Sequence, residues 1–116
     1  MTKEGRIKVM GFESAIKLNP GQNVIINNND FCNFIFPPES KFSYESDLWA
    51  VGRIMYYLLL GCESFIDEFT NMNEFLKELP FNISKQAADC LRRLLEPNRR
   101  KRHKLNLIYM LPFFSQ

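Results

Sequence analysis

The chain has 116 residues, of which 46% are hydrophobic, and a net charge of +2. These values suit one small globular domain with a hydrophobic core, and the charge is too low to indicate a nucleic-acid partner by itself. The three cysteines are far apart and the single histidine stands alone, so neither suggests a metal site. We expect reduced thiols, and because residues 1–15 lack the apolar core of a signal peptide, an intracellular protein, cytoplasmic or nuclear.

The first forty residues indicate two short strands and a long loop. Arg6–Met10 alternates polar and apolar residues as a strand does, and Ala15–Leu18 could form a second strand. Asn19-Pro20-Gly21 is a turn signal. The polar stretch within residues 22–33 is typical of an exposed loop. A long irregular segment in a compact domain is usually functional or disordered.

The strongest pattern is the apolar run from Ser46 to Gly61, which predicts a helix. Five apolar residues fall at helical spacing, and four more fill most of the remaining circumference: Leu48, Val51, Met55, Leu58 and Leu59, then Trp49, Ile54, Tyr57 and Leu60. A helix that is apolar nearly all round belongs in a core or a membrane, and this one is too short to span a bilayer comfortably. We expect a buried central helix, with Ser43 as its N-cap and Gly61 in a left-handed conformation at its end.

Three further helices are predicted after this one. A weak amphipathic pattern covers Asp67–Leu79. Ser84 should cap the next helix, whose apolar face consists of Ala87, Leu91, Leu94 and Leu95. The basic connector Asn98–Lys104 leads to a last short helix at Leu105–Met110. The predicted fold is therefore mainly α, with a short β-hairpin and helices packed around a buried central helix.

The order of these landmarks resembles the C-terminal lobe of a eukaryotic protein kinase. Residues 5–15 are similar to the strand and the Asp-Phe-Gly segment of that family, and Pro37-Pro38-Glu39 resembles the Ala-Pro-Glu that closes its activation segment. Residues 46–52 are similar to the start of its helix F, and Leu94–Arg102 resembles its Leu-Leu segment with the following Arg. Gly61–Phe65 and the ending Pro112-Phe113-Phe114 match two further motifs.

The resemblance covers nearly all of residues 1–116, as one partial kinase-like domain that starts at the Asp-Phe-Gly position. The run Gly52–Tyr56 and the Phe-Phe-Ser ending are nearest to polo-type Ser/Thr kinases. Phosphoryl transfer needs a Gly-rich loop, a strand Lys, and a catalytic-loop Asp and Asn, all of which precede that position in the family. We expect the small lobe and half of the large lobe to be missing, and the chain to lack catalytic residues and a cofactor.

The surviving part of the family's metal site is degenerate. Gly11 stands where the family has its metal-binding Asp, followed by Phe12, and Glu13 replaces the family's Gly. Glycine offers no side-chain oxygen, whereas Mg²⁺ prefers carboxylates and phosphates. Glu13 is either a surface carboxylate or a substitute ligand that would need a rearranged backbone. Cys32 replaces the Thr that steadies the catalytic Asp in the family, and a thiol is a weak donor.

The scaffold residues of the family persist. Glu39 and Arg102 occupy positions that form an ion pair in the family, although a solvated basic turn is an alternative for Arg102. Trp49 belongs to the helix F motif. Asp47 anchors the catalytic loop there, so here it is either a favourable helix N-terminal charge or a carboxylate that awaits a partner's loop.

These features favour an inactive kinase-like lobe that binds a protein partner, either a protein kinase that it regulates as a lobe mimic or a second copy of itself. We expect the interface at Phe12, Phe34, Ile35 and Phe36, which face the missing half or a substrate in the family. No membrane is expected as a partner, and no nucleic acid, since no aromatic residue interleaves with the basic connector. The alternatives are a C-terminal fragment of an active Ser/Thr kinase, and an adaptor with no kinase target.

Overall fold

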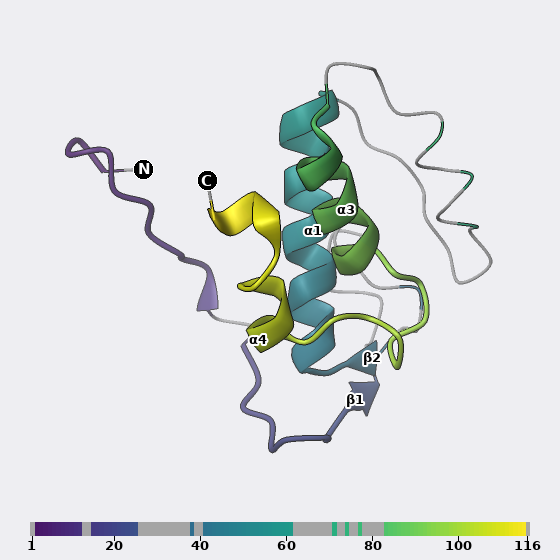
Figure 1. The fold of residues 1–116 in the computed structure, drawn as a ribbon. Coiled ribbons are helices and arrows are strands. Elements are labelled where there is room, and N and C mark those ends of the chain that lie inside the picture. Colours follow the sequence, from purple (N-terminus) through teal and green to yellow (C-terminus); the bar gives the residue numbers. More distant parts are fainter. Residues whose placement is uncertain are drawn as a thin grey trace.

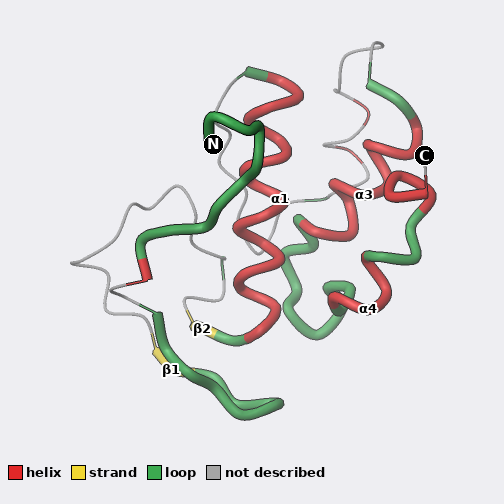
Figure 2. The backbone as a smooth tube through the Cα atoms, turned by 90° about the vertical axis from the view of Figure 1, so that its left-hand side faces the viewer, coloured by secondary structure: helices red, strands yellow, loops and turns green. Residues whose placement is uncertain are grey.

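A computed structural model describes residues 2–12, 15–25, 41–61 and 83–115, together with Pro38, Asn71, Glu74 and Lys77. These residues are mainly helical (Figures 1 and 2). The elements are two short strands, three α-helices and a final 3-10 turn: β1 (Val24–Ile25), β2 (Lys41–Phe42), α1 (Tyr44–Leu60), α3 (Lys85–Leu94), α4 (Leu105–Ile108) and η3 (Pro112–Ser115).

Helix α1 is the longest element, and both of its predicted ends are confirmed. Ser43 is its N-cap, and the Ser43 backbone N–H donates to Ser46 Oγ at 2.9 Å, as in one half of a capping box. At the other end Gly61 has φ 70°, and its N–H donates to the Tyr57 carbonyl at 2.7 Å. Glycine adopts this left-handed conformation without the steric cost of a Cβ, so it ends the helix cleanly.

Helix α3 lies alongside α1 (Figure 1), and the two helices are in close contact at Gly52. A Cβ placed at Gly52 would lie 2.8 Å from Leu94 Cβ and 2.8 Å from Leu95 Cδ2. The predicted cap of α3 is confirmed, because Ser84 Oγ accepts from the Ala87 N–H at 3.1 Å. Its predicted apolar face is also buried, with Leu91, Leu94 and Leu95 each 0% exposed.

The hydrophobic core lies along the α1–α3 contact and forms two clusters. One contains Trp49, Tyr56, Leu91 and Leu95. The other joins α1 and α3 to the last elements of the chain, through Leu48, Cys90, Leu94, Ile108 and Leu111. Cys90 is fully buried, as expected for a structural thiol, whereas Cys32 and Cys62 lie outside the described residues. The last short helix is confirmed as α4, followed by η3.

The predicted hairpin at Arg6–Met10 and Ala15–Leu18 is wrong. Neither range is a strand, and the antiparallel pair is formed instead by β1 and β2, with Val24 opposite Phe42. Period-2 alternation makes a segment compatible with a strand, but a strand also needs a partner for its backbone hydrogen bonds. Residues 7–10 have no such partner within the described chain.

The prediction that α1 is buried all round is also wrong. Trp49 is 1% exposed, but Leu58 is 76% exposed and Ile54 52%. Among the described elements, α3 and β2 pack on α1, and they cover only part of its circumference. The predicted helix at Asp67–Leu79 falls mostly outside the described residues, where only Asn71, Glu74 and Lys77 are placed. One face of α1 therefore presents apolar side chains to solvent.

The different exposure of Trp49 and Leu58 predicts effects of very different size for two substitutions in the same helix. Trp49→Ala should lower the free energy of unfolding by about 3–5 kcal/mol, because it empties a site in the core. Leu58→Ala should change it by less than about 0.5 kcal/mol, since the side chain is already mostly in water. Urea denaturation of both variants checks this, and a large loss for Leu58→Ala would show that the outer face is covered.

Candidate functional site

The first turn of α1 brings the N-terminal segment and the helices together. The Tyr44 hydroxyl donates to the Leu18 carbonyl at 2.5 Å, which holds residues 15–21 beside the start of the helix. Because Ser43 fixes the helix start, Asp47 lies one turn into α1. This end of α1 borders two neighbouring hollows, both of which are lined by Tyr44 and Asp47.

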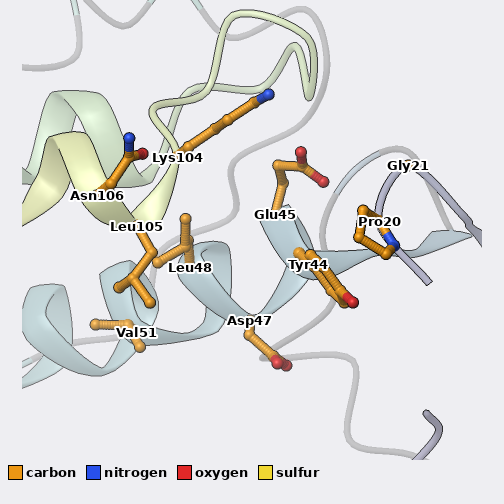
Figure 3. Close-up of a pocket in the computed structure, with 10 residues that line it drawn as sticks. All are labelled: Pro20, Gly21, Tyr44, Glu45, Asp47, Leu48, Val51, Lys104, Leu105 and Asn106. Carbon is orange, nitrogen blue, oxygen red and sulfur yellow. The ribbon is translucent and has the colours of Figure 1, made fainter. Parts of the chain in front are cut away.

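The first hollow lies between α1 and α4 and has a volume of about 590 Å³ (Figure 3). Its apolar side chains are Leu48 and Val51 from α1 and Leu105 from α4. Its polar rim carries Glu45 and Asp47 from α1, whose carboxylates point to opposite sides of the helix (Figure 3). Glu45 lies on the side of Lys104 and Asn106, while Pro20 and Gly21 close one end. The site thus combines an apolar floor with a few polar groups at its rim, as ligand-binding hollows do.

The second hollow, of about 470 Å³, lies under the N-terminal segment. Val9, Met10, Gly11 and Phe12 line one part of it, and Phe42, Ser43 and Tyr44 line another, with Ala15, Ile16, Leu18 and Asp47. Phe12 is 66% exposed, so it borders this hollow without filling it. The structure therefore brings Gly11 near Asp47, as sequence reasoning alone did not foresee.

The Asp47 carboxylate is exposed and makes no hydrogen bond or ion pair with any residue that the structure describes. Partial burial raises its pKa above the ordinary value. A carboxylate that has lost some water without gaining a partner is poorly compensated. It would be better stabilised by a cation or a hydrogen-bond donor from another segment.

Arg102 is buried, with 3% of its surface exposed, so the alternative of a solvated basic turn is wrong for this side chain. Its Nε donates to the Glu96 carbonyl and its Nη1 to the Glu45 carbonyl, both at 3.0 Å. Its guanidinium also lies over the Trp49 ring, 5.0 Å from the centroid. Arg102 therefore connects the last third of the chain to the first turn of α1. Its predicted partner Glu39 lies outside the described residues.

The other predicted site residues are placed only in part. Gly11 has φ 83° and offers no side-chain ligand atom, while Glu13 lies outside the described residues, as do Phe34, Ile35 and Phe36. Among the residues that are described, no group of three His, Cys, Asp or Glu side chains could hold a metal ion. No described helix is both long and apolar enough to cross a bilayer.

A charged cluster on α3 was missed by the sequence reasoning. Asp89 forms ion pairs with Arg92 at 2.7 Å and Arg93 at 3.0 Å, and Arg93 Nη1 contacts His103 Nε2. Burial lowers the pKa of His103, and the positive charges of Arg93 and Arg92 lower it further, against the opposing Asp89 carboxylate. The i, i+3 and i, i+4 spacing on a helix was the signal for the ion pairs. The cluster fastens the basic connector to α3.

Comparison with known proteins gives a consistent group of relatives. The chain is 30% identical to 3-phosphoinositide-dependent protein kinase 1 of Arabidopsis thaliana, over 86% of this chain and 24% of the relative. It is 27% identical to Serine/threonine-protein kinase PLK4 of Drosophila willistoni, over 100% of this chain and 16% of that kinase. It is 28% identical to Sperm motility kinase Z of Mus musculus, over 86% of this chain and 22% of that kinase.

The chain is related to Ser/Thr protein kinases. The resemblance inferred from the motifs is confirmed, and the relatives include a polo-type kinase. The chain spans about a quarter or less of the length of these relatives. No protein-family model matches the chain, and no solved structure does.

The contribution of the buried Arg102 side chain to stability can be tested by substitution. Arg102→Ala should lower the free energy of unfolding by about 3 kcal/mol or more, because it removes two charge-assisted hydrogen bonds and a buried cation. Arg100→Ala, in the same connector but exposed, is the control and should stay within about 0.5 kcal/mol. Thermal or urea unfolding measures both.

The same variant tests the predicted ion pair. In a double-mutant cycle with Glu39→Gln, we expect a coupling energy above about 0.5 kcal/mol. If the losses in the two single variants simply add, Arg102 stabilises the fold through the two carbonyl groups and Trp49, and Glu39 has no part in this site.

Proposed function

We propose that this chain is a catalytically inactive, kinase-like C-terminal lobe that acts as a protein-binding module and regulates a protein kinase by docking as a lobe mimic. In this proposal α1 corresponds to helix F of the family, and the chain begins at the Asp-Phe-Gly position. The kinase relatives and the mainly helical fold support it. Gly11 at the metal position argues against a Mg²⁺ site of the family's kind.

The observation that carries the binding role is the uncovered surface at the start of α1. Asp47 has no partner among the described residues, two hollows adjoin it, and Phe12 is 66% exposed beside one of them. Further along α1, Val51, Ile54 and Leu58 are also exposed. Contiguous exposed apolar surface often marks an interaction site, and the Asp47 carboxylate offers a contact there to a cation of the partner. A kinase domain is the proposed partner.

The second candidate is a C-terminal fragment of a Ser/Thr kinase whose N-terminal part performs ATP-dependent phosphoryl transfer. The observation in its favour is that the chain spans a quarter or less of the kinases it matches. The coding sequence upstream of Met1 discriminates between the two. A Gly-rich loop and a His-Arg-Asp motif in frame there would favour the fragment.

The proposal can be tested by titrating the purified chain with Mg²⁺-ATP and, separately, with a polo-type kinase domain. A ligand that binds only the folded state stabilises it by about 2.7 kcal/mol at a hundredfold excess over Kd. We expect no shift of the melting temperature with Mg²⁺-ATP, and saturable binding to the kinase domain by isothermal calorimetry. A saturable shift with Mg²⁺-ATP would contradict the inactive lobe, and no binding to the kinase domain would contradict the lobe mimic.

Substitutions locate the surface that binds. Phe12→Ala combined with Phe34→Ala and Phe36→Ala should abolish the binding while leaving the melting temperature unchanged, because aromatic anchors dominate interfaces. Phe114→Ala is the matched control, since Phe114 is also exposed, at 47%, but lies in η3 at the other end of the chain. Equal losses in both variants would place the interface elsewhere.

A further inference from the structure

The segment Gly5–Met10, here called the N-terminal arm, is the least covered part of the described chain. Ile7 is 85% exposed, Val9 77% and Met10 88%. From Ile7 to Met10 no backbone group bonds to another described residue. The arm is extended and runs away from the helices (Figure 1). An extended run of open backbone with apolar side chains is what an unprotected edge strand presents to another chain.

The arm also carries an alternating pattern of charge. In an extended segment successive side chains point to opposite sides, so Ile7 and Val9 lie on one side of the arm, and Arg6, Lys8 and Met10 lie on the other. One side is therefore apolar, and the other carries both cations of the arm. This is the alternation that predicted a strand, although the arm has no strand partner in this chain.

The first hollow is complementary to this pattern. Leu48, Val51 and Leu105 offer an apolar floor, and the Asp47 carboxylate, which has no partner among the described residues, lies at the rim. Lys104 lies on the side of Glu45, away from Asp47 (Figure 3), and repels cations, so a bound cation is directed toward Asp47. From Tyr44 to Val51 the helix rises about 10 Å, and three strand residues span about the same length. The hollow therefore suits one short strand.

We propose that the N-terminal arm of a second copy of this chain occupies the first hollow, and that two copies exchange arms symmetrically. Ile7 and Val9 then cover the apolar floor, while Arg6 and Lys8 face Asp47. The chain's own arm is held elsewhere, because Val9–Phe12 line the second hollow. Reciprocal exchange closes as a twofold dimer, which leaves no open binding surface for further growth. This inference uses the same surface as the proposed function but does not rest on it, since a chain that binds no kinase could still pair.

Sedimentation equilibrium with two charge-reversed variants tests the exchange. The arm variant carries Arg6→Glu and Lys8→Glu, and the hollow variant carries Asp47→Lys. We expect a concentration-dependent dimer for the natural chain. Each variant alone should have a dimer Kd raised about tenfold or more, because every dimer contains the contact twice and both copies then repel. A mixture of the two variants should pair again, since each acidic arm meets a lysine and each basic arm meets Asp47.

Control variants separate this effect from a general change of charge. Lys3→Glu with Lys77→Glu makes the same change in net charge as the arm variant but outside the arm, at two exposed positions, and should leave the dimer unchanged. Circular dichroism shows that each variant is folded. A natural chain that stays monomeric at all concentrations overturns the proposal. A dimer that neither variant weakens overturns it as well, and so does a mixture that fails to pair.

Discussion

The close approach of α1 and α3 at Gly52 is the constraint on which the rest of the structure depends. With no side chain at this position, Leu94 and Leu95 lie against the α1 backbone, where a Cβ would be 2.8 Å from each. This contact buries Trp49, Tyr56 and Leu91 in one cluster and Leu48, Cys90 and Leu94 in the other. Since α4 and η3 pack on α3, their positions also follow from it.

Arg102 fixes the position of the basic connector relative to the start of α1. Its bonds to the Glu96 and Glu45 carbonyl groups and its position over Trp49 hold the end of the core cluster against the first turn of the helix. That turn presents Tyr44, Glu45 and Asp47 to the two hollows. The candidate site is therefore built by the same contacts that stabilise the core, while its carboxylate is left without a partner in the described chain.

Residues 43–61 and 84–95 could be predicted from the sequence because their signals are local. Ser43, Gly61 and Ser84 act through their own backbone, and the 3.6-residue period of α3 identifies its buried face. The exposure of Leu58 and the lack of a described strand partner for residues 7–10 could not be predicted, because both depend on which other segments pack there. The two hollows beside Asp47 were missed for the same reason, as they join residues far apart in the sequence. The kinase relationship was predictable from the order of several weak motifs, and the relatives confirm it.

The free energy of unfolding of Gly52→Ala tests the central contact most directly, because two effects of opposite sign compete. In an open helix, alanine is more favourable than glycine by about 1 kcal/mol. At a tightly packed position the added methyl group costs about 1–3 kcal/mol or more, and the contacts at Gly52 are with a Leu94 Cβ that cannot move without α3. We expect urea unfolding to give a lower free energy of unfolding for Gly52→Ala than for the natural chain. A variant that is as stable as the natural chain, or more stable, would contradict the close packing of α1 on α3.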